Sequence, residues 1–210
     1  VSPERIRVVY PGVSPRFTVI PPERIAEIKK RLELPESFFL YLGNLEPRKN
    51  VSGLVSAFEK IGGEAALVIA GAEGWRSAEL FARAAHSKRN SKIRFLGYIG
   101  HDDKPALYAA ATAFVYPSFY EGFGLPPLEA MACGTPVIAS HASSLGEAMD
   151  DSGLLVNPHD INEIASAMQM IMDDERLRND LRARGLARAK KFSWDASAEK
   201  LESVFTEFTH

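Results

Sequence analysis

The residues best placed to do chemistry are two glutamates at the ends of a glycine-rich segment. This segment reads Glu121, Gly122, Phe123, Gly124, Leu125, Pro126, Pro127, Leu128, Glu129. The glycines can bend the chain sharply and bring bare backbone close to a ligand. A helix is predicted to begin behind them, and its free N–H groups and positive dipole end favour a phosphate. We expect both glutamates to face one cleft. Because carboxylates repel phosphates, they should bind hydroxyl groups of a ribose and a sugar.

A second candidate site is the cation pair Arg48-Lys49, which follows a predicted strand over 38–42 and Gly43. Open α/β sheets bind ligands at the carboxyl ends of their strands. The planar guanidinium of Arg48 and the point charge of Lys49 together suit a diphosphate. Taken alone, both motifs also fit a bland alternative. The glutamates would then be solvated loop residues, and the cations would precede a helix capped by Asn50.

The elements that must position these residues alternate between strand and helix. Apolar runs predict strands over 38–42, 65–70, 93–96, 113–116, 136–139 and 153–156. Helices are predicted over 22–34, 51–61, 75–88, 102–111, 128–133, 143–149 and 175–190, with a further helix capped by Asp160. The repeat of about 20 to 30 residues indicates an α/β fold with a doubly wound parallel sheet.

The two ends of the chain are expected to differ from this repeat. A short strand followed by a turn is predicted over 7–13. The last segment forms a narrow apolar seam made of Trp194, Ala198, Leu201, Phe205 and Phe208. This seam could pack on its own domain or on another one, and the sequence leaves both open.

Composition excludes several classes of protein. The 210 residues are 46% hydrophobic and 25% charged, which is ordinary for a soluble globular protein. No apolar run is long enough to span a membrane, and no secretory leader is evident. The single cysteine, Cys133, fits a cytoplasmic protein without an internal disulfide. The net charge of −2 argues against binding nucleic acid.

Motifs for other cofactors are missing from the sequence. No P-loop is present, and no dinucleotide-binding glycine pattern follows an early strand. The histidines and acidic residues lack the spacing of metal ligands. We therefore expect no metal ion or other cofactor, and the cations and the helix dipole would neutralise a diphosphate.

The segment from Glu121 to Glu129, followed by Ala-Cys-Gly-Thr-Pro-Val, resembles the Glu-x7-Glu signature of retaining GT-B glycosyltransferases of family 4, also called group 1. Gly43-Asn-Leu-Glu-Pro-Arg48-Lys49-Asn50 is similar to the motif that binds the sugar donor's phosphates in this family. The resemblance extends from about Arg7 to about Phe192. It implies a Rossmann-like sheet that forms the C-terminal half of a GT-B fold, with a C-terminal helical arm.

The resemblance also implies a division into domains and a reaction. Residues 1–192 would bind the nucleotide-sugar donor, and residues 193–210 would form a helix that crosses to an absent N-terminal acceptor domain. The chain would then be a fragment or one half of a split enzyme. The reaction would be retaining transfer of a hexose, preferably from GDP-mannose, to a glycan or lipid-linked acceptor in polysaccharide biosynthesis.

Residue roles follow from the same resemblance. Arg48, Lys49 and Glu121 would be catalytic, with the cations on the departing diphosphate and Glu121 on the sugar hydroxyls. Glu129 would hold the ribose. The remaining residues would bind the sugar donor largely through their backbone: Gly43, Tyr98, Ile99, Gly122, Phe123, Gly124, Leu125.

Two other functions stay open at this stage. One is a GT-B-like epimerase or phosphorylase, and the other is a non-catalytic module that binds a nucleotide sugar. Peripheral association with the inner face of the membrane also stays open.

Overall fold

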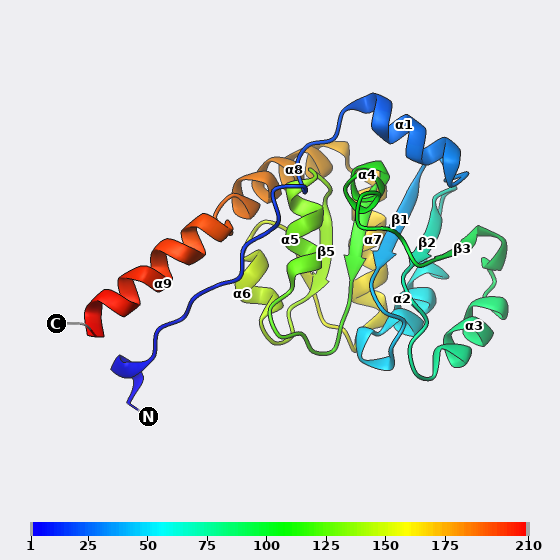
Figure 1. Ribbon diagram of the computed structural model, residues 1–210. Coiled ribbons are helices and arrows are strands. Elements are labelled where there is room, and N and C mark those ends of the chain that lie inside the picture. The colour runs from blue at the N-terminus through cyan, green and yellow to red at the C-terminus, as the bar shows by residue number, and fades with distance from the viewer. Residues whose placement is uncertain (1, 209–210) are drawn as a thin grey trace.

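Six short parallel strands form one sheet within residues 2–208, the part of the chain that the computed structural model describes (Figure 1). The side chain of Phe208, a member of the predicted apolar seam, lies outside the described part of the chain. Across the sheet the order is β3-β2-β1-β4-β5-β6. The strands are β1 (Phe38–Leu42), β2 (Ala66–Ala70), β3 (Ile93–Gly97), β4 (Ala113–Tyr116), β5 (Val137–Ser140) and β6 (Leu154–Val156). The prediction of a doubly wound parallel sheet is confirmed.

The winding direction reverses between β1 and β4, which are neighbours in the sheet. Ligands of open α/β sheets bind beside the carboxyl ends of the strands at such a switch point. Every residue of β1, β2, β4 and β5 is buried, as expected of strands covered on both faces. The loops that follow β1 and β4 are therefore the natural place for a site.

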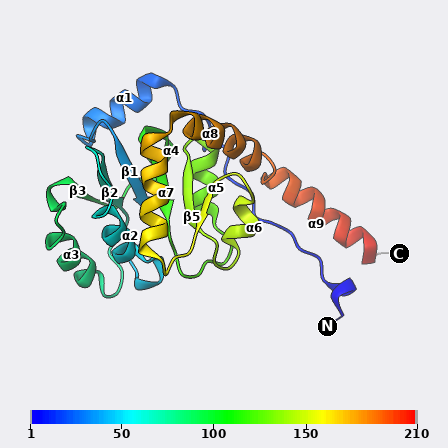
Figure 2. The ribbon, with the colours of Figure 1, turned by 180° about the vertical axis from the view of Figure 1, so that it is seen from behind.

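Helices cover both faces of the sheet (Figures 1 and 2). On one face lie α1 (Pro22–Arg31), α4 (Lys104–Ala110) and α5 (Leu125–Ala132), with α6 (Leu145–Met149) beside α5. On the other lie α2 (Val51–Phe58), α3 (Ser77–Ala85) and α7 (Ile161–Asp173). The helix α8 (Glu175–Ala189) packs against α5 and α7. Short 3-10 turns occur at Pro3–Arg5, Pro47–Lys49 and Asn90–Lys92.

The predicted cap of α7 is confirmed, because the Asp160 carboxylate accepts the backbone N–H groups of Asn162 and Glu163 at 2.8 and 3.2 Å. Backbone conformation makes α1 and α3 shorter than predicted. The helix α1 ends at Arg31, and Glu33 beyond it adopts a φ of 50°. The helix α3 begins only at Ser77, because Arg76 adopts a φ of 60°.

The last helix, α9 (Trp194–Phe208), projects away from the sheet as an arm, and the N-terminal segment runs beside it (Figures 1 and 2). Ser197 donates a hydrogen bond to the Tyr10 carbonyl at 2.6 Å, and Arg7 pairs with Glu207 at 2.8 Å. The predicted helical arm is confirmed. Of its apolar seam, Trp194 is 55% exposed and Leu201 45%, so these residues do not pack on the chain's own core.

The strand predicted over 7–13 is wrong. Only Val13 forms an isolated bridge, with Ser193, and its N–H donates to the Phe192 carbonyl at 2.7 Å. The segment pairs with the root of the arm instead of an edge of the sheet. A side chain at Gly12 would collide with the backbone of Trp194, so the chain can pass this point only as glycine.

Among the described residues, no helix combines the length and the apolar content that a membrane crossing requires.

Candidate functional site

Three predicted catalytic residues meet in one ion-pair cluster, which we call the cation cluster: Arg48, Lys49 and Glu121. The Lys49 ammonium donates to Glu121 Oε1 at 2.7 Å, and Arg48 Nη1 donates to Glu121 Oε2 at 3.2 Å. Arg48 and Lys49 lie on the 3-10 turn after β1, and Glu121 lies in the loop after β4. The sheet's switch point thus brings together residues that are 72 or more positions apart.

Two members of the cluster are shielded from water, since Lys49 is 9% and Glu121 8% exposed, whereas Arg48 is exposed. Burial alone would raise the pKa of Glu121. A hydrogen bond from Lys49 and the charge of Lys49 outweigh burial, so the pKa lies below its ordinary value. Glu121 is therefore ionised at neutral pH and neutralises part of the cationic charge beside it.

Backbone contacts fasten the loop of the cations to the loop of the carboxylate. The Phe119 N–H donates to the Arg48 carbonyl at 2.9 Å, and Arg48 Nη1 donates to the Tyr120 carbonyl at 2.7 Å. The Glu121 N–H donates to the Ser143 hydroxyl at 2.9 Å. The geometry of the cluster is thus set by these two loops together with the loop after β5, which contains Ser143.

Asn50 joins these loops as well. Its side chain does not cap the helix behind it, which contradicts that part of the alternative interpretation of the cation pair. Its backbone adopts a left-handed φ of 55°, and its side chain makes no capping hydrogen bond. Instead Nδ2 donates to the Pro117 and Pro158 carbonyls at 3.2 and 2.7 Å. This amide therefore ties the loop after β1 to the loops after β4 and β6.

The second glutamate lies in a separate cavity of about 200 Å³, which we call the Glu129 pocket. Five predicted sugar-donor residues line it, namely Gly43, Tyr98, Ile99, Leu125 and Glu129. Arg48, Lys49 and Glu121 do not line it. The two carboxylates therefore do not share a single cavity in this structure.

Burial raises the pKa of Glu129, while a hydrogen bond from Tyr108 and the charge of Lys104 partly oppose that rise. The Tyr108 hydroxyl donates to Glu129 Oε2 at 3.2 Å. Sequence reasoning missed both Lys104 and Tyr108, although both line this pocket. Their spacing of four residues places them on one face of α4, and that spacing was the available signal.

The glycine loop connects the cation cluster to the Glu129 pocket. Gly124 precedes α5 with a φ of 109°, and a side chain there would collide with Leu145. The space around Gly122 is open. The Phe123 ring stacks on Tyr10 at 5.4 Å, near the arm. Since Pro126 and Pro127 have no N–H, the donors at this helix end are those of the loop and Leu125.

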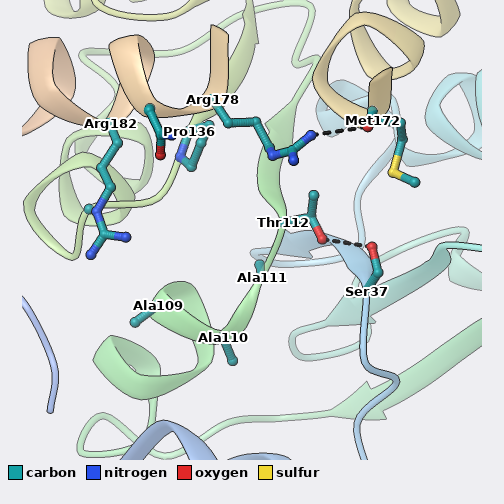
Figure 3. A pocket seen from close by; sticks show the side chains of 11 residues that line it. Ser37, Ala109, Ala110, Ala111, Thr112, Pro136, Met172, Arg178 and Arg182 are labelled. Atoms are coloured by element: carbon teal, nitrogen blue, oxygen red, sulfur yellow. Dashed lines mark hydrogen bonds between the residues drawn. The ribbon is translucent and has the colours of Figure 1, made fainter. Parts of the chain in front are cut away.

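A larger cavity, of about 380 Å³, lies beneath α8 at the amino-terminal ends of the strands, opposite the Glu129 pocket (Figure 3). Its two cations, Arg178 and Arg182, point in different directions, and Arg178 donates to the Ile171 and Met172 carbonyls at the end of α7. None of the predicted site residues lines this cavity. The size of a cavity alone therefore does not identify the functional site.

The described residues contain no group of three or more His, Cys, Asp or Glu side chains that could hold a metal ion. Cys133 is buried, and burial raises the pKa of its thiol to about 12. A thiol with so high a pKa is a poor nucleophile.

Comparisons with known proteins agree with this architecture. The family model described as "Glycosyl transferases group 1" matches residues 24–188. The "O-antigen chain mannosyltransferase B" of Escherichia coli is 42% identical over 179 residues, which cover 83% of this chain and 47% of that protein. The chain thus spans about half the length of this relative.

Solved structures show the same fold. Sucrose-phosphate synthase from Thermosynechococcus elongatus is 31% identical with a TM-score of 0.85, over 97% of this chain and 52% of the other. The Anabaena protein Alr3699/HepE, in complex with UDP and glucose, is 22% identical with a TM-score of 0.89, over 98% and 58%. Both similarities span nearly the whole chain.

Proposed function

Since the chain belongs to the group 1 glycosyl transferases, we propose that it binds the nucleotide-sugar donor of a retaining hexosyltransferase. The observation that carries this proposal is the meeting of Arg48, Lys49 and Glu121 beside the Glu129 pocket, at the switch point of the sheet. Two cations, a helix amino end and two carboxylates are what a diphosphate between two polyols requires.

Each part of the site receives a role in the proposal. Arg48 and Lys49 stabilise the nucleoside diphosphate as it departs, where negative charge grows in the transition state. Backbone N–H groups of Phe123, Gly124 and Leu125 bind its phosphates. Glu129 accepts hydrogen bonds from the ribose hydroxyls, and Glu121 holds hydroxyls of the transferred sugar. Neutralisation is assigned to these groups, and the proposal includes no metal ion.

The nucleobase would lie beside Tyr98 and Ile99, at the outer end of the Glu129 pocket. Tyr98 is 67% exposed and Ile99 is buried, so the segment offers an open ring next to a fixed backbone. GDP-mannose is the proposed sugar donor, supported by the E. coli mannosyltransferase relative. The complex of the Anabaena protein with UDP and glucose supports nucleotide binding in this fold.

Transfer is proposed to need a second, acceptor-binding domain in addition to residues 1–210. The acceptor would be a glycan or a lipid-linked saccharide, and the reaction would take place in the cytoplasm, at the inner face of the membrane for a lipid acceptor. A closed cleft between two domains excludes water and aligns the reactants. The arm helix α9, with its exposed Trp194 and Leu201, is the surface proposed to meet that domain.

The test combines binding with turnover. Calorimetry with GDP, UDP, GDP-mannose and UDP-glucose should show one site per chain, with GDP-mannose preferred. Joining the chain to the amino-terminal half of the E. coli relative should produce a mannoside of retained anomeric configuration. Binding without turnover in any joined form would favour the non-catalytic module, and a free epimer or sugar phosphate as product would favour an epimerase or phosphorylase.

A further inference from the structure

A buried hydroxyl touches the cation cluster without belonging to the predicted site. The Lys49 ammonium donates to the Tyr116 hydroxyl at 2.7 Å, the same distance as to Glu121 Oε1. The nitrogen also lies 5.1 Å from the centre of the Tyr116 ring. Lys49 therefore has two oxygen partners of different kinds, one charged and one neutral.

The side chain of Tyr116 is held more rigidly than that of Lys49. Tyr116 ends β4, is 1% exposed, and stacks on Tyr41 at 6.0 Å and on Phe114 at 5.5 Å. A lysine, in contrast, carries its charge on four flexible methylene groups and loses rotamer entropy when that charge is fixed. A rigid acceptor at the ammonium reduces the ordering that a ligand must impose.

The two acceptors respond differently to an incoming diphosphate. Glu121 is ionised, so it competes with a phosphate for the ammonium. Burial and the nearby charge of Glu121 raise the pKa of Tyr116, which keeps its hydroxyl neutral. A neutral hydroxyl continues to orient the ammonium while the remaining N–H bonds turn to phosphate oxygens.

We propose that Tyr116 is a positioning residue that holds the Lys49 ammonium ready for the diphosphate of the sugar donor. The inference rests on the proposed function of Lys49. It assigns to Tyr116 no contact with the ligand, and its whole effect is transmitted through Lys49.

The test is a double-mutant cycle measured by calorimetry with GDP and guanosine. Tyr116→Phe keeps the ring and both stacking contacts. It should lower the affinity for GDP about tenfold and leave the affinity for guanosine unchanged. Lys49→Met keeps most of the stem and should also weaken GDP. On the Lys49→Met background, Tyr116→Phe should have no further effect, because the group it positions is gone.

Tyr41→Phe is the matched control. Tyr41 is fully buried and stacks on Tyr116, but its hydroxyl donates to the Asn44 carbonyl at 3.0 Å instead of contacting Lys49. It should leave the ratio of GDP to guanosine affinity unchanged. An equal change in both tyrosine variants would indicate general loosening and would overturn the inference.

The outcomes separate the inference from the function on which it rests. No GDP binding by the wild-type chain contradicts the proposed function. GDP binding that Lys49→Met weakens, with additive losses in the double variant, overturns only the role of Tyr116. If Tyr116→Phe does not fold, NMR of the wild-type Lys49 ammonium in the GDP complex decides: a retained hydrogen bond to the Tyr116 hydroxyl supports the inference, and its loss on GDP binding overturns it.

Discussion

Glu121 is the residue whose surroundings change its expected behaviour most. It accepts hydrogen bonds from Lys49 and Arg48, the two cations proposed to bind phosphate. A carboxylate so placed holds the cations in register and also competes with an anionic ligand for them. The two effects oppose each other, so substitution of Glu121 measures which one is larger.

We predict that Glu121→Gln tightens GDP binding severalfold while it abolishes most transfer in the joined enzyme. The amide keeps the shape and an acceptor oxygen but removes the competing charge. Glu46→Gln is the comparison, since Glu46 lies 3.7 Å from Arg48 alone and should give a smaller gain. Weaker GDP binding in Glu121→Gln, measured by calorimetry, would mean that the carboxylate mainly holds the cations in place.

Glu129 predicts a conflict between stability and binding. Its pKa is raised by burial, so the folded protein binds this proton more tightly than the unfolded chain does. The carboxyl group therefore lowers the free energy of unfolding progressively as the pH rises above its ordinary value of 4.5.

Glu129→Gln should accordingly raise the melting temperature more at pH 7 than at pH 4, while it weakens GDP and guanosine alike. The affinities for the two ligands should fall equally, because both ligands carry the ribose that Glu129 is proposed to bind. Glu199→Gln, on the exposed surface of α9, is the control and should change neither property. A larger gain at pH 4 than at pH 7 would contradict the assigned direction of the pKa.

At the scale of the elements, Asn50 shows how the loops at the switch point are held together. Its Nδ2 bonds the Pro117 and Pro158 carbonyls, and its left-handed backbone leads from the 3-10 turn into α2. The turn therefore presents Arg48 and Lys49 from a position fixed by three strands of the sheet.

We predict that Asn50→Gly lowers the free energy of unfolding by about 1–3 kcal/mol, because two buried carbonyls lose their partner. Glycine tolerates the left-handed φ, so this variant isolates the amide contacts. Asn50→Ala should lose about 1 kcal/mol more, for backbone strain. Urea denaturation measures both, and an unchanged midpoint for Asn50→Gly would show that the amide does not brace the loops.

Local signals predicted most of the sheet and helices. Apolar runs such as 38–42 and 113–116 marked buried strands, and Asp160 marked a helix start, because those features depend on neighbouring residues. The strand within 7–13 was misassigned, and the contacts of the Asn50 amide were not predicted, because these hydrogen bonds go to distant partners, namely Phe192 and Pro158. The pairing of Tyr116 with Lys49 depends in the same way on strand order, which no local pattern contains.

At the scale of the whole molecule, the candidate functional site lies at the carboxyl ends of the strands, and a helix covers their amino ends. The cation cluster and the Glu129 pocket lie where β1 and β4 end, whereas α8 covers the edge where the strands begin (Figure 1). The arm and the N-terminal segment leave the body together and expose Tyr10, Trp194 and Leu201. This arrangement keeps the proposed binding of the sugar donor within one sheet and leaves the arm available to a second domain.

The central claim is that Arg48 and Lys49 bind the diphosphate of a nucleotide sugar. Titration of GDP and guanosine into the wild-type chain and into the double variant Arg48→Ala/Lys49→Ala tests it most directly. The adjacent exposed cations Lys190 and Lys191, changed together to Ala, are the control for lost charge. We expect one GDP site whose affinity falls at least a hundredfold in the Arg48/Lys49 variant alone. The affinity for guanosine should stay unchanged, since each charge-assisted contact is worth about 1.5–3 kcal/mol. Equal losses for GDP and guanosine, or an equal loss of GDP in the Lys190/Lys191 control, would contradict it.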